Sequence, residues 1–393
     1  MAGSTPPAAA LRVLHCIPDM AGGGAERQLT LLAEAQTRSG IDAHVALTRG
    51  GPNLTRLEAS GAVVHHIRTR GNHDPRLLWR LHRLVRTVAP AIIQTWLTQM
   101  DVMGGLVATM HGLPWVLSER ASATAYQDRL KERVVRRVVG ARADAVAANS
   151  ETGLSYWRDK VRAGAQLAVV PNCLSLGEID TAPPADLREF GLEPGRPVAL
   201  FAGRLVAQKN LPLLLSILSR VLPLEDAVAL LCGDGPDRSW LETSIRDQGL
   251  SERVRVLGYR SDLLGLMKRA QVFVNPSTFE GQPNTVLEAM ACGCPVVVSA
   301  IAEHRELLDE SCAAIVPLDA LDQWVAAVQS GLRGSDGSRT RANRARQLAR
   351  GHSPEATARG YRAIYEQLLT RRRTPGPADA EALHTLFSSA GSR

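Results

Sequence analysis

The sequence predicts an α/β fold made of two doubly wound domains that face a central cleft. Short runs rich in β-branched residues alternate with longer helical runs along most of the chain, which is typical of βαβ units and parallel sheets. The 393 residues exceed what one hydrophobic core usually serves. A polar stretch rich in proline, 180–197, interrupts the alternation, which then restarts. We therefore expect one domain over 11–180 and a second over 196–350.

The first half begins with a strand and a helix that ends at Gly40, a residue suited to a helix C-terminus. Its strands are expected at 11–17, 41–47, 61–67, 91–96, 115–119, 143–149 and 166–172. Its helices are expected at 24–40, 75–88, 99–110 and 125–139.

The second half repeats the architecture without repeating the sequence. Its strands are expected at 198–203, 227–233, 254–258, 271–275, 295–299 and 313–317. Its helices are expected from 211 onward and at 237–248, 263–268, 321–332 and 337–349. A last helix, 354–370, has Ser353 as a suitable N-cap and Pro354 at its first position, and we expect it to cross back to the first domain. The tails, 1–10 and 371–393, are expected to be disordered.

Composition narrows the class of partner. The net charge of +7 favours anionic partners, whereas the aromatic content of 4% argues against a platform for stacking nucleic-acid bases. The six cysteines form no CxxC pair, and no His/Cys group has metal-binding spacing, so no metal is expected. The N-terminus lacks the features of a signal peptide, and no apolar run reaches the roughly 18 residues of a membrane span. We therefore expect a cytoplasmic protein.

Polar and glycine residues follow several predicted strands. Arg204 and Lys209 follow 198–203 and could neutralise two phosphates. Gly23 and Gly24 belong to a glycine run that opens a helix, where backbone N–H groups can approach an anion. Taken singly, the glycines also fit an ordinary tight turn and the cations fit solvated side chains. Their co-occurrence after strands favours an anion-binding cleft, because ligands of such sheets bind beyond the strands' carboxyl ends.

Two glutamates frame the most informative stretch, FEGQPNTVLEAMACGCPVV. Glu280 lies in a turn-prone run, and Glu288 follows after seven intervening residues, inside a predicted helix. Each alone could be a surface carboxylate.

With these motifs in their order, the chain resembles the GT-B glycosyltransferases of the large retaining family 4 over nearly its whole length. The E-x7-E segment from Glu280 to Glu288 is the most specific element. FAGRLVAQKN, GDGP, PNC at Pro171 and GGGAERQL are the other landmarks. The resemblance implies two Rossmann-like domains, with the acceptor on the side of the first and the nucleotide sugar in the second.

The resemblance also implies roles for individual residues. Glu280 would accept hydrogen bonds from the donor sugar, and backbone amides from Gly281 through Asn284 and Thr285 would hold sugar and phosphate oxygens. Glu288 would bind the ribose hydroxyls. Arg204 and Lys209 would stabilise the departing pyrophosphate. The resemblance implies front-face attack, in which the leaving phosphate takes the acceptor's proton. No metal or other cofactor is implied, and the absence of an Asp-x-Asp pair argues against the metal-dependent GT-A transferases.

Three departures from the family pattern bear on the site. Gln282 stands where an aromatic or aliphatic residue is common. Gln99 or Met100 occupies a first-domain position where histidine is common. Arg120 stands where relatives place a His or Arg facing the donor sugar, and we expect it near the reaction centre; a structural ion pair is the alternative.

The expected activity is transfer of a hexose-type sugar from a UDP- or GDP-linked donor to a glycan, lipid-linked or small-molecule acceptor, with no nucleic-acid partner. The base, sugar, acceptor, linkage and oligomeric state stay open. A GT-B-like nucleotide-sugar epimerase and a non-catalytic partner of a glycan assembly complex are the rival hypotheses.

A basic helix around Arg129–Arg142 raises the question of membrane contact. Arg129, Arg133, Arg136 and Arg137 lie beside a valine stripe, as in lipid-acceptor relatives whose first domain rests on anionic membranes. The same stripe also suits a helix that packs on its own sheet. Peripheral contact with the inner membrane face is thus one of two expectations.

Overall fold

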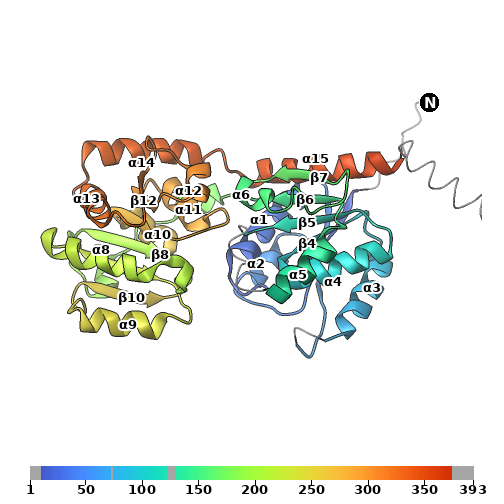
Figure 1. Ribbon diagram of the computed structural model, residues 1–393, viewed down its shortest axis with the longest axis horizontal. Coiled ribbons are helices and arrows are strands. Elements are labelled where there is room, and N and C mark those ends of the chain that lie inside the picture. The colour runs from blue at the N-terminus through green and yellow to red at the C-terminus, as the bar shows by residue number, and fades with distance from the viewer. Residues whose placement is uncertain (1–9, 72–73, 122–129, 374–393) are drawn as a thin grey trace, which may run out of the picture.

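Two α/β domains lie side by side in the computed structural model (Figure 1), which describes residues 10–71, 74–121 and 130–373. Both domains are doubly wound parallel sheets with helices on their two faces. The GT-B expectation from the sequence, two such domains facing each other, is confirmed.

The first domain contains seven described strands in the order β3-β2-β1-β4-β5-β6-β7, all parallel. Its strands are β1 (Arg12–Cys16), β2 (Asp42–Leu47), β3 (Val63–His66), β4 (Ile92–Trp96), β5 (Trp115–Glu119), β6 (Ala145–Ala148) and β7 (Gln166–Val169). Its helices are α1 (Gly24–Arg38), α2 (Leu54–Ala59), α3 (Arg76–Val88), α4 (Leu97–Met110), α5 (Leu130–Gly140) and α6 (Glu151–Ser155). The central strands are buried on both faces, which explains their continuous apolar sequences.

The second domain contains six described strands in the order β10-β9-β8-β11-β12-β13, again all parallel. Its strands are β8 (Val198–Ala202), β9 (Val228–Cys232), β10 (Val254–Gly258), β11 (Val272–Asn275), β12 (Val296–Ser299) and β13 (Ala314–Val316). Its helices are α7 (Leu176–Thr181), α8 (Leu211–Leu224), α9 (Arg238–Asp247), α10 (Leu263–Arg269), α11 (Asn284–Ala291), α12 (Ala302–Leu307), α13 (Leu321–Leu332) and α14 (Asp336–Ala349). Short 3-10 turns occur at Leu187–Phe190 and Ala207–Lys209.

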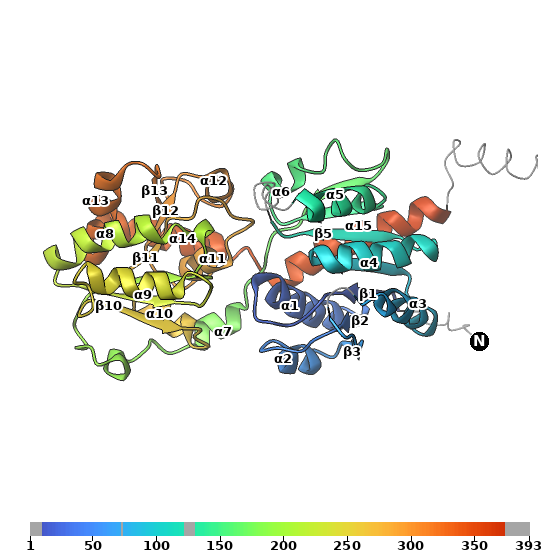
Figure 2. The same ribbon diagram turned by 60° about the horizontal axis from the view of Figure 1, so that its bottom comes forward.

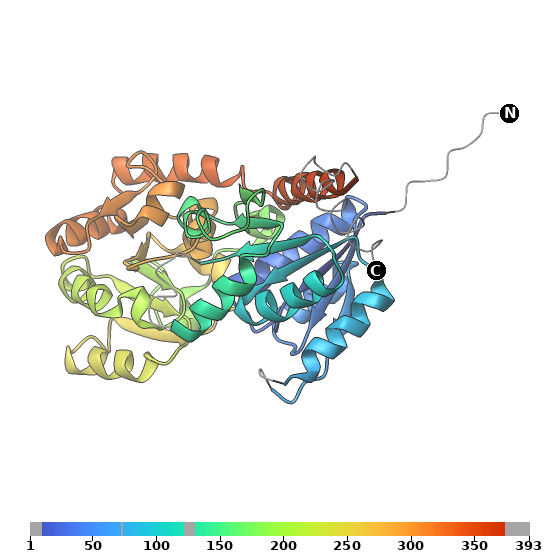
Figure 3. The same ribbon diagram turned by 45° about the vertical axis from the view of Figure 1, so that its right-hand side comes forward.

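The chain crosses between the domains twice. The first crossing comes earlier than expected: Leu174 and Ile179 already pack in the core of the second sheet, so the boundary at residue 180 was placed too late. After α14 the chain returns as α15 (Pro354–Arg373), the red helix that lies along the first domain in Figure 3. Tyr361 and Tyr365 of this helix are buried in the core of the first domain. Arg371, expected in the tail, continues this helix.

The basic helix differs from the expectation in one important residue. On α5, Arg136 is 3% exposed and binds two buried carboxylates, Asp101 at 2.9 Å and Glu119 at 2.7 Å. Arg136 therefore belongs to the core and cannot meet a membrane. Arg137 is exposed, Arg129 lies outside the described residues, and the side chain of Arg133 is not described.

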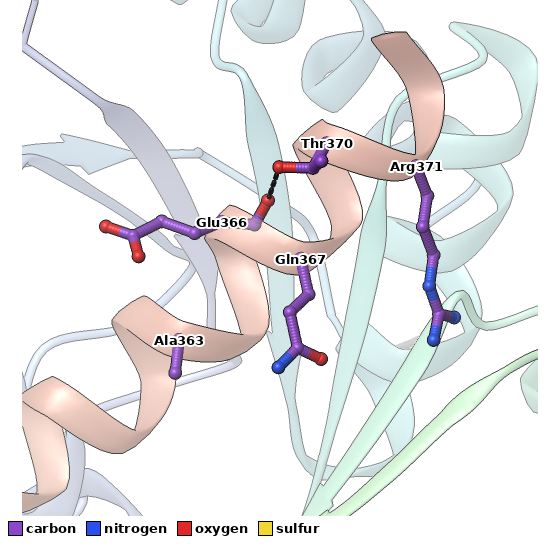
Figure 4. A pocket seen from close by; sticks show the side chains of 5 residues that line it. All are labelled: Ala363, Glu366, Gln367, Thr370 and Arg371. Carbon is purple, nitrogen blue, oxygen red and sulfur yellow. Dashed lines mark hydrogen bonds between the residues drawn. The ribbon is translucent and has the colours of Figure 1, made fainter. Parts of the chain in front are cut away.

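A hollow of about 500 Å³ lies against the C-terminal part of α15 (Figure 4). Its lining side chains come from a single helix, and one of them, Arg371, donates to the carbonyl oxygen of Gly164 at 2.8 Å. It brings together no charged or polar groups from different elements. It is therefore a surface depression of the first domain, apart from the loops that the sequence singled out.

Candidate active site

The loops predicted to bind ligand all start at the centre of a sheet. β1 lies between β2 and β4, and β8 lies between β9 and β11, so each is the strand at which the order reverses. Doubly wound sheets bind ligands outside the carboxyl ends of strands at such a switch point. The glycine run 22–24 follows β1, Arg204 and Lys209 follow β8, and Glu280 follows β11. The fold thus places the predicted residues at the two switch points.

Glu280 is the centre of a buried polar network. Its Oε1 lies 2.5 Å from Nζ of Lys209 and accepts from the hydroxyl of Ser277 at 2.7 Å. The amides of Gln208 and Asn275 lie at 3.3 and 3.5 Å from its two oxygens. These contacts join the loop after β8 to the loop after β11. The carboxylate is therefore held in one position.

The charge of Glu280 follows from these neighbours. Burial alone would raise its pKa, but the ammonium of Lys209 and the hydroxyl of Ser277 outweigh that effect and leave the pKa below its ordinary value. Glu280 is 6% exposed and anionic at neutral pH. The loop around it thus carries a fixed negative charge that is balanced by Lys209.

Arg204 differs from Lys209 in its surroundings. Its side chain is exposed, and no ion pair of Arg204 occurs among the described residues. The neighbouring loop is packed tightly, because a Cβ at Gly233 would lie 1.9 Å from the carbonyl oxygen of Gly203. Gly233 also has φ +138°, which explains the glycine of the GDGP landmark. Arg204 therefore leaves a rigid loop with its guanidinium open to solvent.

The turn after Glu280 touches the first domain. A Cβ at Gly281 would lie 2.5 Å from the carbonyl oxygen of Arg120 and 3.3 Å from Nδ2 of Asn149. The guanidinium of Arg120 points elsewhere: it donates to Oδ1 of Asn172 and lies 5.1 Å from the ring centre of Trp96. The structure therefore brings the backbone of Arg120 next to the Glu280 turn, while its predicted role in the reaction stays a prediction.

Glu119, the residue before Arg120, is a buried structural carboxylate. Its carboxylate is 1% exposed and accepts from Arg136 and, at 2.8 Å, from Nε1 of Trp157. It also accepts the backbone N–H of Arg120 at 2.9 Å. Glu119 thus anchors the end of β5 in the core, and Arg120 makes no ion pair with it.

The glycine run lies close to the second domain. A Cβ at Gly24 would lie 2.4 Å from Nδ2 of Asn284, so a larger residue there would displace the Asn284 carboxamide. Gly23 is the N-cap of α1 without a side-chain cap, and the carboxylate of Glu26 lies beside it. Burial and nearby Asp19 raise the pKa of Glu26. The helix start that could receive an anion is thus flanked by the chain's own carboxyl groups.

Glu288 is paired across the domain boundary. Its Oε1 lies 2.7 Å from Nη1 of Arg27 on α1, and the side chain is 5% exposed. Burial raises the pKa of Glu288, while the guanidinium of Arg27 opposes that shift. Figure 2 shows α1 and α7 at the junction of the two domains, near α11. Any ligand of Glu288 has to share it with Arg27 or displace it.

Sequence reasoning missed several residues that shape this site. Gln208, Asn275 and Ser277 hold Glu280, yet only their position after strands could have signalled them. Gln28, next to Arg27, donates to Oδ1 of Asn284 at 3.2 Å. Met100, considered for the histidine position, is fully buried in the first core.

Comparison with known proteins decides the family. The profile described as "Glycosyl transferases group 1" matches residues 196–333, and the profile described as "Glycosyl transferase 4-like domain" matches residues 23–173. The chain belongs to the group 1 glycosyltransferases with the GT-B fold. It therefore transfers a sugar from a nucleotide sugar.

Two curated relatives of this glycosyltransferase are sugar transferases by name. The UDP-Gal:alpha-D-GlcNAc-diphosphoundecaprenol alpha-1,3-galactosyltransferase of Escherichia coli is 27% identical over 65% of this chain and 70% of its own length. The lipopolysaccharide core biosynthesis mannosyltransferase LpsB of Rhizobium meliloti is 32% identical over 51% of this chain and 62% of its own length.

Solved structures share the fold of this glycosyltransferase. Alr3699/HepE from Anabaena, in complex with UDP and glucose, has a TM-score of 0.79 and 20% identity, and covers 92% of this chain and 100% of that one. Sucrose-phosphate synthase from Thermosynechococcus elongatus has a TM-score of 0.78 and 19% identity, and covers 91% and 99% of the two chains.

The described residues contain neither a cluster of metal-ligating side chains nor a helix able to span a membrane. Within 10–71, 74–121 and 130–373, no three His, Cys, Asp or Glu side chains gather as a metal site would require. In the same ranges, no helix combines the length and apolarity needed to span a bilayer.

Proposed function

We propose that this glycosyltransferase is a retaining, metal-independent enzyme that moves a hexose-type sugar from a UDP- or GDP-linked donor to a lipid-linked glycan acceptor. The observation that carries the proposal is the Lys209–Glu280 pair at the switch point of the second domain. A fixed cation beside the sugar-binding turn supplies the charge that a metal ion supplies in other transferases.

Each donor group has a partner in this assignment. Glu280 accepts hydrogen bonds from the sugar hydroxyls. Backbone amides at Gly281, Asn284 and Thr285 bind phosphate oxygens, which is supported by the missing side-chain cap at the start of α11. Gly23 and Gly24 close over the phosphates from the first domain, and Glu288 binds the ribose.

The transfer step then needs orientation and charge rather than a protein nucleophile. Lys209 and Arg204 stabilise the pyrophosphate as the bond to the anomeric carbon breaks. The acceptor hydroxyl attacks from the same face, and the leaving phosphate takes its proton. Arg120 lies at the same turn and supports the developing charge.

One experiment tests reaction type and metal independence together. Purified enzyme treated with excess EDTA is incubated with UDP- and GDP-sugars and a lipid-linked glycan acceptor, and the product's anomeric configuration is read by NMR. We expect transfer that persists with EDTA and a product with the donor's configuration. Loss of activity that one divalent ion restores, or an inverted product, would contradict the proposal. Conversion of the donor without acceptor would indicate the epimerase.

The acceptor proposed here is lipid-linked, which implies peripheral contact with the inner face of a membrane. A face of the first domain supports it. On α3, Arg76, Trp79, Arg83 and Arg86 are all exposed and recur at helical spacing, and Trp79 is 57% exposed. No ion pair of these arginines occurs among the described residues. A basic helix with an exposed tryptophan suits the interface of an anionic bilayer.

Apolar side chains on neighbouring helices extend this α3 face. Met110 at the end of α4 is 62% exposed, and its neighbour His111 lies 2.9 Å from His82 of α3. Val134 and Val138 of α5 are exposed as well. The protein face proposed to contact the membrane is thus centred on α3, and α5 contributes only its exposed side.

Binding to vesicles of phosphatidylglycerol and phosphatidylcholine should be lost when the arginines Arg76, Arg80, Arg83 and Arg86 are changed to Gln. Each basic residue near an anionic surface contributes about 1 kcal/mol, and the contribution falls at high salt. Co-sedimentation with the vesicles measures the bound fraction of protein at low and at high salt.

The matched control removes the same charge from α14 in the second domain by changing Arg339, Arg341, Arg344 and Arg346 to Gln, and should bind normally. Equal loss in both variants would mean that net charge, and not the α3 face, drives binding. No binding of the wild-type protein at low salt would overturn the contact.

A further inference from the structure

Asn172 stands at the first crossing between the domains and belongs to the PNC landmark, to which the proposed reaction assigns no role. It is 2% exposed. Its backbone carbonyl accepts from Nδ1 of His352, which lies just before α15 at the second crossing, at 3.0 Å. The residue therefore sits where both connections between the domains meet.

The side chain of Asn172 bonds in two directions. On one side, its Nδ2 donates to Oδ1 of Asn284 at 2.7 Å and to the carbonyl oxygen of Gln282 at 3.2 Å. Its backbone N–H donates to Oε1 of Gln282 at 2.5 Å. On the other side, its Oδ1 accepts from Nη2 of Arg120. One carboxamide thus links the sugar-binding turn to Arg120.

The partners fix the orientation of this carboxamide. Arg120 can only donate, so it requires the oxygen of Asn172. The carbonyl of Gln282 can only accept, so it requires the nitrogen. A flipped amide would lose both kinds of bond, and any residue without one donor and one acceptor breaks one side of the link.

Arg120 depends on this link for its direction. Its other contacts are the hydroxyl of Tyr361 at 3.4 Å, which is long for a hydrogen bond, and the face of Trp96. Stacking on an aromatic ring restrains the plane of a guanidinium more than its rotation within that plane. The bond to Asn172 therefore decides where the remaining N–H groups of Arg120 point.

We propose that Asn172 is a positioning residue that couples docking of the turn at Gln282–Asn284 to the placement of Arg120 for transfer. The inference rests on the proposed function. When the turn docks, Asn172 is held by two acceptors and presents its oxygen to Arg120. When the domains separate, the Asn172 carboxamide loses its acceptors on Gln282 and Asn284. Asn172 is then no longer fixed, so it no longer orients the guanidinium of Arg120.

The test compares Asn172→Ala with Asn172→Asp. The alanine variant loses both sides of the link. The aspartate variant keeps an acceptor for Arg120 but places an oxygen against two carbonyl oxygens, so docking is lost. We expect both to lower kcat by at least about tenfold, within the range that misplacement of a reacting group costs. Affinity for the bare nucleoside diphosphate should stay within about threefold, because Glu288, which binds its ribose in the proposed assignment, is unchanged.

The matched control removes another tie between the domains. Glu306 of α12 accepts from the backbone N–H groups of Glu151 and Thr152, at 2.7 and 2.8 Å, and neither hydrogen-bonds nor forms an ion pair with Arg120 in the described part of the chain. Glu306→Ala should leave kcat within about twofold of wild type. If it lowers kcat as much as Asn172→Ala, the effect comes from domain contact in general and the proposal is overturned.

A double-mutant cycle gives the second measurement. If Asn172 acts through Arg120, Asn172→Ala should change kcat little in an Arg120→Ala background, whereas independent effects would multiply. Multiplied effects overturn the proposal. Thermal melting shows whether each variant is folded. If Asn172→Ala is not folded, Asn172→Asp takes its place in the cycle. If the wild-type enzyme transfers no sugar, the proposed function is refuted. If the effects in the cycle multiply, only the positioning role of Asn172 is refuted and the proposed function still stands.

Discussion

Replacing Lys209 with methionine is expected to lower the rate of sugar transfer by about 10²–10³ at saturating donor. Removing one preorganised charge from a site that stabilises a leaving group typically has an effect of this size. Lys209 is also the ammonium that keeps buried Glu280 ionised. Under the proposed assignment, the variant therefore loses the cation and also weakens the hydrogen bonds between the Glu280 carboxylate and the sugar. Steady-state kinetics with saturating nucleotide sugar measures the loss.

Two comparisons separate the role of Lys209 in the reaction from its role in the fold. Arg204→Ala removes an exposed charge from the same loop and should slow transfer without lowering the melting temperature. Glu288→Gln should mainly weaken binding of the bare nucleotide, as measured by calorimetry. A Lys209 variant with near-normal turnover, or equal loss of nucleotide affinity in Lys209→Met and Glu288→Gln, would contradict the assigned roles.

Replacing Arg136 with alanine is expected to destabilise the protein by about 3–5 kcal/mol, because it leaves two buried carboxylates without their shared cation. Chemical denaturation at neutral pH measures this loss. The exposed neighbour provides the control: Arg137→Ala should change the free energy of unfolding by no more than about 0.5 kcal/mol. Similar melting of both variants would mean that the cluster contributes little.

The loss in free energy of unfolding caused by Arg136→Ala should depend on pH. Burial raises the pKa of Asp101 to about 6 even with Arg136 present. A carboxyl group whose pKa is higher in the folded state contributes stability at low pH, and that contribution is lost as the pH rises through about 6. Without Arg136 the preference for the protonated form grows. The alanine variant should therefore recover part of its stability as the pH falls below 6, and a deficit unchanged by pH would contradict this account.

The sequence predicted the fold because its signals are local. Buried parallel strands read as continuous apolar runs, and Gly40 and Ser353 mark helix ends by their own chemistry. Ser353 does accept the N–H of Ala356 at 3.2 Å. The early crossing at Leu174 was missed because two leucines and an isoleucine just before the proline-rich stretch give no period to recognise.

The candidate site was predicted only in part, for a similar reason. Spacing along the chain identifies Glu280, Lys209 and Glu288, but it cannot say that Arg27 lies against Glu288, because their proximity depends on how two domains dock. Arg136 shows the opposite error. A helical stripe of arginines predicts a charged face, and nothing local indicates that one of them meets Asp101 in the core.

The ion pair between Arg27 and Glu288 should weaken the apparent affinity for the donor. Under the proposed assignment, ribose and Arg27 compete for one carboxylate, so the apparent dissociation constant is the intrinsic one divided by the fraction of molecules in which Glu288 is free. If that fraction is about one tenth, a donor appears about tenfold weaker than its contacts allow. Losing Arg27 would then tighten binding, although the residue lies beside the ligand.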